Sequence, residues 1–210
     1  PAIVPTFGVR AMLGTNPIAF AAPATCNRPF LLDMATSAAP VGRLMTAWRQ
    51  GRSIPEGWAM DERGRPVTSP RRAFALRRLA PLGSFKDLAS HKGYGLAAMV
   101  EILSFVLPGS RPNEPREAPR PAIGHFFMAM DPARFCPADQ FGQDLDSLMD
   151  TLRSTEPADP SVPVMVAGDP EYSARNERLV QGIPIARAVV EDLRWICRAS
   201  GVEFLLDEIV

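Results

Sequence analysis

The sequence predicts an α/β fold, in which strands and helices alternate without the strict βαβ order of a parallel sheet. Runs typical of strands occur at residues 18–20, 30–34, 124–132 and 162–167, and apolar patterns of helical period lie between and after them. In addition, 46% of the 210 residues are hydrophobic, which is enough for a substantial core in one large domain or two small ones.

The first strands are expected from turn chemistry and apolar runs. Residues 14–17 read Gly-Thr-Asn-Pro, a turn that leads into a strand beginning at Ile18. After a second turn at 25–29, residues 30–34 are predicted as a buried strand that carries a carboxylate, Asp33, near its end.

The next two helices are predicted from periodicity and charge. A helix with Pro40 at its first position should bury a stripe formed by Val41, Leu44, Met45 and Trp48 and end at Gly51. Residues 58–60 are expected to be extended, and residues 61–64 to form a turn. We interpret Arg71, Arg72, Arg77 and Arg78 as the solvated face of a short helix.

A candidate anion site lies at the start of the third helix. His91 and Lys92 precede Gly93 and Gly95 and an apolar helix that should be central to the core and end at 108–109. A helix N-terminus presents unpaired amides, glycines let a ligand approach the backbone, and lysine adds a full charge. Solvated capping residues are the alternative, and the helix start near Pro40 is a second candidate.

The second half of the chain continues the alternation. Residues 110–121 are rich in proline and predict a surface loop, and the strand at 124–132 starts beside His125. An amphipathic helix should cover 141–152. Asp169 is expected to cap a helix with Pro170 at its first position. A last helix, with Val189, Val190, Leu193, Ile196 and Cys197 toward the core, should end at Gly201 before a short strand at 202–206.

Composition excludes several classes of function. Lys and Arg number 23 and Asp and Glu also number 23, so the charge favours neither nucleic acid nor a membrane as partner. Three scattered cysteines predict no disulfide framework and no zinc site, and a reducing cytoplasm fits them best. Hydrolase, kinase and metalloprotease motifs are absent, and a pyridoxal-binding role for Lys92 has no identifiable partner residue.

Six motifs occur in the order found in one family of oxidoreductases. They are Gly-Thr-Asn-Pro at 14–17, Leu-Asp-Met-Ala-Thr-Ser at 32–37, Ile-Pro-Glu-Gly-Trp at 54–58, Pro-Leu-Gly at 81–83, His-Lys-Gly-Tyr-Gly-Leu at 91–96 and Gly-His-Phe-Phe at 124–127. In this respect the chain resembles the malate/L-lactate dehydrogenase family, which also contains sulfolactate, ureidoglycolate and diketogulonate dehydrogenases and cyclic ketimine reductases.

The resemblance implies a fold unlike the Rossmann fold, with a large, mainly antiparallel or mixed sheet flanked by helices, and a homodimer in which two subunits form the sites. It implies an NAD- or NADP-dependent hydride transfer with a small 2-hydroxy acid or 2-oxo acid, and no metal; a cyclic ketimine is the alternative substrate. The weak match of residues 93–98 to the dinucleotide fingerprint G-x-G-x-x-A is then a coincidence. The residues expected to contact the cofactor are Leu32, Asp33, Met34, Ala35, His91, Lys92, Gly168, Asp169 and Glu171.

The chain departs from the family at the catalytic acid. The family's proton-donating histidine lies in a Ser-His-Gly motif of an N-terminal helical region, and neither His91 nor His125 matches that motif. We therefore expect residues 1–210 to be one cofactor-binding domain plus C-terminal helices of a longer oxidoreductase, with little activity alone. A non-catalytic module that binds nucleotide or dimerises is the competing hypothesis, and the choice between NAD and NADP stays open.

Overall fold

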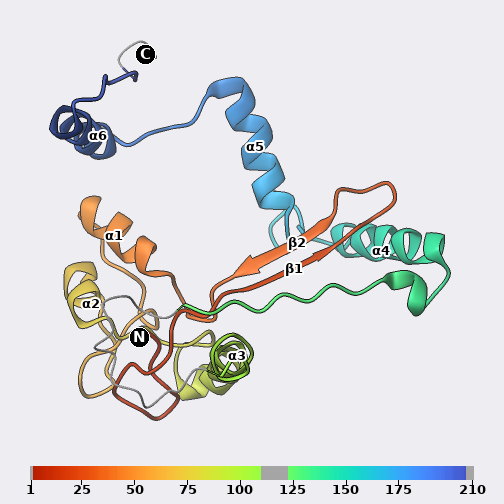
Figure 1. The fold of residues 1–210 in the computed structure, drawn as a ribbon, viewed down its shortest axis with the longest axis horizontal. Coiled ribbons are helices and arrows are strands. Elements are labelled where there is room, and N and C mark those ends of the chain that lie inside the picture. Colours follow the sequence, from red (N-terminus) through yellow and green to blue (C-terminus); the bar gives the residue numbers. More distant parts are fainter. Residues whose placement is uncertain (1, 110–122, 207–210) are drawn as a thin grey trace. The chain divides into compact units, whose positions relative to one another are not determined.

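The computed structural model describes residues 2–109 and 123–206 and divides into two compact units, Pro1–Ala167 and Gly168–Val210 (Figure 1). The first unit contains β1 (Ile18–Ala22), β2 (Phe30–Met34), α1 (Val41–Arg49), α2 (Pro70–Leu76), η1 (Lys86–Leu88), α3 (Ser90–Glu101), a π-helix η2 (Ile102–Val106), η3 (Pro132–Arg134) and α4 (Ala138–Arg153). The second unit contains α5 (Asp169–Gln181) and α6 (Arg187–Ser200). Within the described ranges, no helix is long and apolar enough to cross a membrane.

The two predicted N-terminal strands are confirmed and form an antiparallel hairpin, in which Ile18 pairs with Met34 and Ala22 with Phe30. The prediction that the second strand is buried is wrong, because Leu31 and Asp33 are exposed and the other residues of β2 are only partly covered. In the described part of the chain these strands pair only with each other. The larger sheet that the resemblance implies is therefore not seen there.

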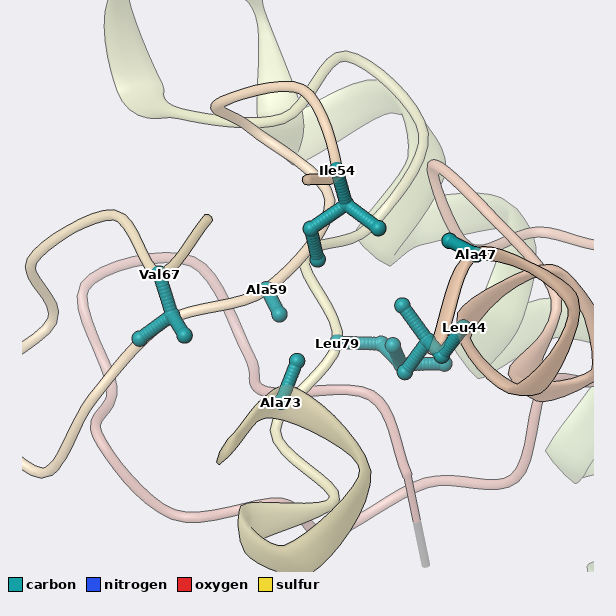
Figure 2. Packing of buried hydrophobic residues seen from close by; sticks show 7 residues of the cluster. All are labelled: Leu44, Ala47, Ile54, Ala59, Val67, Ala73 and Leu79. Carbon is teal, nitrogen blue, oxygen red and sulfur yellow. The ribbon is translucent and has the colours of Figure 1, made fainter. Parts of the chain in front are cut away.

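The core of the first unit lies between α1, α2 and the chain segments around residues 54–67 and 79 (Figure 2). Leu44 of α1 and Leu79 are its largest fully buried members, and Ala73 of α2 faces them. Ala59 forms a β-bridge with Leu79, which confirms the extended piece expected at 58–60.

Helix α1 differs from its prediction in two details. It begins at Val41, so Pro40 is the N-cap residue and not the first helical residue. Ala47 is buried in place of Trp48, whose side chain is 45% exposed and packs its ring against Phe74 of α2 at 6.0 Å. The indole therefore covers the neighbouring helix instead of filling the core.

The turn at residues 61–64 is confirmed, and a carboxylate organises it. Asp61 accepts backbone N–H bonds from Arg63 at 2.8 Å and Arg65 at 2.9 Å, and it pairs with the Arg65 guanidinium. These bonds, the Arg65 amide above all, lower the pKa of Asp61 to about 2. Helix α2 follows, capped by the Ser69 hydroxyl, and three of the four arginines singled out around it are exposed, as interpreted.

Helix α3 is not central to the core, contrary to its apolar pattern. Its buried residues are Ser90, Gly93 and Ala97, whereas Met99 and the following Ile102 are about half exposed. The chain turns at residues 107–109 as expected, with Gly109 at φ 87. The predicted loop at 110–121 lies outside the described residues.

Three predicted strands, at 124–132, 162–167 and 202–206, are wrong for the described structure. A strand requires a partner for its backbone groups, and among the described residues no ladder forms with these segments. At the end of the segment 162–167, the Leu31 N–H of β2 donates to the Ala167 carbonyl at 3.2 Å. Phe127 and Met128 of the first segment are largely exposed.

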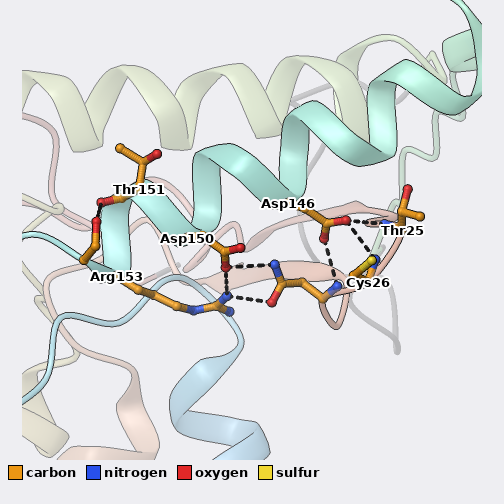
Figure 3. A network of polar contacts seen from close by, with 8 residues as sticks. Thr25, Cys26, Asp146, Asp150, Thr151 and Arg153 are labelled. Atoms are coloured by element: carbon orange, nitrogen blue, oxygen red, sulfur yellow. Dashed lines mark hydrogen bonds and ion pairs between the residues drawn. The ribbon is translucent and has the colours of Figure 1, made fainter.

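Helix α4 is confirmed as amphipathic, with Met149 fully buried, and it binds the turn of the β1–β2 hairpin (Figure 3). Asp146 accepts the N–H groups of Thr25 at 3.2 Å and of Cys26 and Asn27 at 2.8 Å each. The Asn27 amide in turn donates to Asp150 at 3.0 Å and accepts from Arg153 at 2.9 Å. We call Asp146, Asp150 and Arg153 of α4, together with residues 25–27, the turn clasp.

The hydrogen bonds of the turn clasp stabilise the ionised form of the Asp146 carboxyl. Its pKa is lowered from the ordinary value of 3.8, chiefly by the Asn27 N–H and further by the Cys26 N–H, which outweigh the opposing effect of partial burial.

The second unit has little buried surface of its own. Helix α6 ends at Gly201, with φ 66, as predicted. The core stripe expected along it is not buried in the described structure: Val189, Val190, Leu193 and Cys197 are partly exposed, and Ile196 is 48% exposed.

Candidate functional site

The site is built around the residue that follows β2 by two positions. Thr36 is 0% exposed, and its hydroxyl donates to the carbonyl oxygens of Thr15 and Asn16 at 3.0 Å each. Its own N–H donates to the Thr15 carbonyl, and its carbonyl accepts from the Leu82 N–H at 2.9 Å. Thr36 thus joins the end of β2, the turn before β1 and the loop before α3, and we call Thr15, Asn16, Thr36 and Leu82 the strand-end junction.

Asn16 extends the junction to α3. Its side-chain amide donates to the Ala97 carbonyl at 2.8 Å and to Glu101 Oε2 at 2.9 Å. The residue has φ 37, a left-handed conformation that asparagine tolerates better than most residues, and Pro17 follows it.

Gly93 provides the second contact of α3 with the junction. A Cβ at this position would overlap the backbone N and O of Leu82 and lie 2.6 Å from the Leu82 Cβ. The expectation that this glycine brings a ligand close to the backbone is therefore wrong, because the space is filled by the chain itself. At Gly95 an added Cβ would meet nothing within 4 Å.

The first turn of α3 carries two exposed, basic side chains, His91 and Lys92. These residues are helical and do not precede the helix, since α3 begins at Ser90 after Ala89, which has φ 63. The N–H of Ser90 donates to the Phe85 carbonyl and that of Lys92 to the Ala89 carbonyl. Because these two amides are already bonded within the chain, we expect an anion here to be attracted more by the Lys92 ammonium than by them.

The structure brings two of the three predicted site segments together. Leu32, Asp33, Met34 and Ala35 lead directly into Thr36, which is bonded to Leu82, and Leu82 packs against Gly93, the residue after Lys92. Of the four strand-end residues, Asp33 is exposed and the others are partly covered. The exposed, charged start of α3 and the end of β2 are thus linked through Thr36 and Leu82.

The third predicted segment belongs to the second unit. Helix α5 begins at Asp169, so the N-cap is Gly168, with φ 103, and Pro170 is the second helical residue; the predicted cap position is wrong by one. A left-handed conformation at the cap suits glycine, which has no Cβ. Glu171 is exposed, and Asp169 is partly covered.

Several other residues bear on the chemistry. His125 is exposed, and its ring stacks on that of Phe127, with 6.1 Å between the ring centroids. Residues 2–109 and 123–206 contain no group of three or more His, Cys, Asp or Glu side chains that could hold a metal ion. The roles of Thr36, Asn16 and Leu82 were missed by sequence reasoning, although the Asn-Pro pair marked Asn16 as a turn residue.

Comparison with known proteins gives consistent matches over nearly the whole chain. A family model described as malate/L-lactate dehydrogenase matches residues 1–194. The malate dehydrogenase of Pyrococcus horikoshii is 40% identical over 209 residues, which are 98% of this chain and 58% of that protein. The (2R)-3-sulfolactate dehydrogenase (NADP(+)) of Chromohalobacter salexigens is 36% identical over 200 residues, 92% of this chain and 55% of that protein.

A solved structure agrees with these matches. The crystal structure of malate dehydrogenase from Entamoeba histolytica superposes on 97% of this chain with a TM-score of 0.87 and 28% identity, and 59% of that chain is covered. The present chain thus shares the α/β fold of these dehydrogenases and spans less than two thirds of the length of these relatives.

Proposed function

This chain belongs to the malate/L-lactate dehydrogenase family, and we propose that it supplies the cofactor-binding part of an NAD(P)-dependent oxidoreductase. The reaction would interconvert a small 2-hydroxy acid and its 2-oxo acid, of the malate, lactate or sulfolactate type. The observation that carries the proposal is the junction that links residues 32–35 to the exposed Lys92 at the start of α3.

We assign cofactor contacts to this chain's own residues. Lys92 would neutralise phosphate charge, and His91 beside it would donate a hydrogen bond to the same group. Leu32, Asp33, Met34 and Ala35 would line the dinucleotide along the strand end. For Gly168, Asp169 and Glu171, the cofactor contact that the resemblance implies stays a prediction. When bound, NAD or NADP supplies the hydride, and the protein orients the reactants and excludes water.

We further propose that the hairpin belongs to a larger, mainly antiparallel sheet in a homodimer. The segment 124–132, which joins no ladder among the described residues, and the exposed side chains of Phe20, Leu31 and Phe127 support this proposal, because such surfaces are normally covered in a stable protein. Measuring the mass of the protein in solution tests the dimer, and a monomer at micromolar concentration would contradict it.

The 210-residue chain alone is expected to bind cofactor but to turn over substrate slowly, because no histidine in it lies in a Ser-His-Gly motif. Pyruvate, oxaloacetate and piperideine-2-carboxylate, each assayed with NADH and NADPH, cover the 2-oxo acid and cyclic ketimine classes. Turnover at the rate of a longer relative would refute this expectation.

The direct test of cofactor binding is the Lys92→Ala substitution, measured by titration of NADH and NADPH fluorescence. Loss of a charged hydrogen bond to phosphate should raise Kd about tenfold or more. Lys92→Arg, which keeps the charge, should retain most of the affinity, and Arg134→Ala, an exposed cation of η3, should leave Kd unchanged. An unchanged Kd in Lys92→Ala would reject the assigned contact.

A further inference from the structure

We propose that Asn16 is a positioning residue for cofactor binding, which fixes the first turn of α3 relative to the end of β2. This inference rests on the proposed function, since it assigns a role at the same site. Asn16 itself need not contact the cofactor, because its side-chain amide is engaged within the protein.

Asn16 is a hydrogen-bond donor through its side chain and an acceptor through its backbone. The two amide hydrogens are accounted for by the Ala97 carbonyl at 2.8 Å and Glu101 Oε2 at 2.9 Å. The backbone carbonyl accepts from the Thr36 hydroxyl at 3.0 Å. One residue therefore bonds α3 through its side chain and the strand end through its backbone.

Two separate links consequently run from Thr36 to α3. The first passes through the Leu82 N–H to the close contact at Gly93, and the second passes through Asn16 to Ala97. Gly93 and Ala97 are four residues apart and lie on one face of the helix, about 6 Å apart along its axis. A helix held at two points of one face can neither slide nor rotate freely, so the backbone from which the His91 and Lys92 side chains project is held in place relative to the end of β2.

The hydrogen-bond donors of the Asn16 side chain can be replaced by acceptors in a single substitution. Both groups facing its amide, a carbonyl and a carboxylate, accept hydrogen bonds. Aspartate at this position would remove both donors and face the Glu101 carboxylate with a like charge. Glutamine at 101 would offer an amide donor to that aspartate and restore one of the two bonds.

The test compares Asn16→Asp, Asn16→Asp with Glu101→Gln, and Glu101→Gln alone. Asn27→Asp is the matched control, since Asn27 also donates its amide to a carboxylate, Asp150, but does so in the turn clasp at the other end of the hairpin. Each full chain is measured for NADH and NADPH affinity by fluorescence titration, for hydrogen exchange of residues 90–96, and for Tm.

Asn16→Asp should raise the cofactor Kd about tenfold and speed hydrogen exchange in residues 90–96. Glu101→Gln alone should stay within about twofold of the unsubstituted chain, and adding it to Asn16→Asp should recover part of the affinity. Asn27→Asp places a carboxylate beside both Asp150 and Arg153, and it should stay within about twofold in Kd whatever its Tm.

Two outcomes would overturn the inference, and they are distinguishable. If the unsubstituted chain binds cofactor and Asn16→Asp binds it equally well, or if both asparagine variants weaken binding only in proportion to their loss of Tm, Asn16 has no positioning role. If the unsubstituted chain binds neither NADH nor NADPH, the proposed function fails, and the cofactor role of Asn16 fails with it.

Discussion

The two ends of the β1–β2 hairpin are held by different chemistry. At the turn, Asp146 and Asp150 of α4 accept hydrogen bonds from residues 25–27, with charged and partly exposed side chains. At the opposite end, the buried Thr36 and the amide of Asn16 bond to backbone carbonyls and to one carboxylate. The junction therefore relies mainly on neutral donors that are buried or partly buried, and the turn clasp relies on ionised acceptors.

This difference has consequences for stability and for function. Bonds to exposed carboxylates weaken when the carboxylate is protonated, whereas buried bonds between neutral groups are insensitive to pH but costly when one partner is removed. The junction lies beside residues 32–35 and 91–92, to which we assign cofactor contacts. A fixed geometry there would serve cofactor binding, whereas no such contact is assigned to the turn.

The largest effect is expected from Gly93→Ala at the junction. The added methyl group would overlap the backbone of Leu82, so the free energy of unfolding should fall by about 3 kcal/mol. Gly95→Ala is the control in the same helix, where the space is open and alanine should stabilise by about 0.5–1 kcal/mol. Urea unfolding measures both, and equal effects would show that α3 does not pack on Leu82.

A smaller loss is expected from Thr36→Val. Valine keeps the shape but leaves the carbonyls of Thr15 and Asn16 without the hydroxyl donor, at a cost of about 1–2 kcal/mol. Thr46→Val is the control, because the Thr46 hydroxyl also bonds a carbonyl, that of Gly42, but is exposed on α1. Thermal unfolding should separate the two variants by several degrees; a loss of equal size in both would argue against a special role of the junction.

The smallest loss of stability is expected on lowering the pH, and it should be confined to the turn clasp. Because the pKa of Asp146 is lower in the folded chain than its ordinary 3.8, its stabilisation is present above that pH and is lost as the pH falls through the lowered value. Hydrogen-exchange protection of the Thr25, Cys26 and Asn27 amides should decrease in that range while that of Thr36 and Leu82 persists.

Two substitutions in α4 check this assignment. Asp146→Asn should remove most of the acid dependence at the turn, because the group that titrates is gone. Asp144→Asn, at an exposed carboxylate that accepts a hydrogen bond from the Gln140 side chain of the same helix, should retain it. Parallel loss of protection at both ends of the hairpin on acidification would mean that the two ends do not respond separately.

The candidate site was predictable in part. His91 and Lys92 were predicted as site residues from a basic pair beside glycines at a helix start, and Asp33 from its place at a strand end; the structure links their segments, and their contact with a cofactor stays a prediction. The function of Gly93 was not, because a glycine that admits a ligand and one that admits the neighbouring backbone look identical in sequence. The junction was missed for a related reason: its bonds join residues 20 to 85 positions apart.

By itself the sequence determined the two hairpin strands, the presence of the main helices and the ordered motifs of the family, because turn chemistry and helical period act over a few residues. Only the tertiary structure decided which apolar residues are buried, that residues 124–132 lack a strand partner among the described residues, and that Thr36 and Asn16 join β2 to α3. Burial and strand pairing depend on groups distant in the chain, whose approach no local pattern specifies.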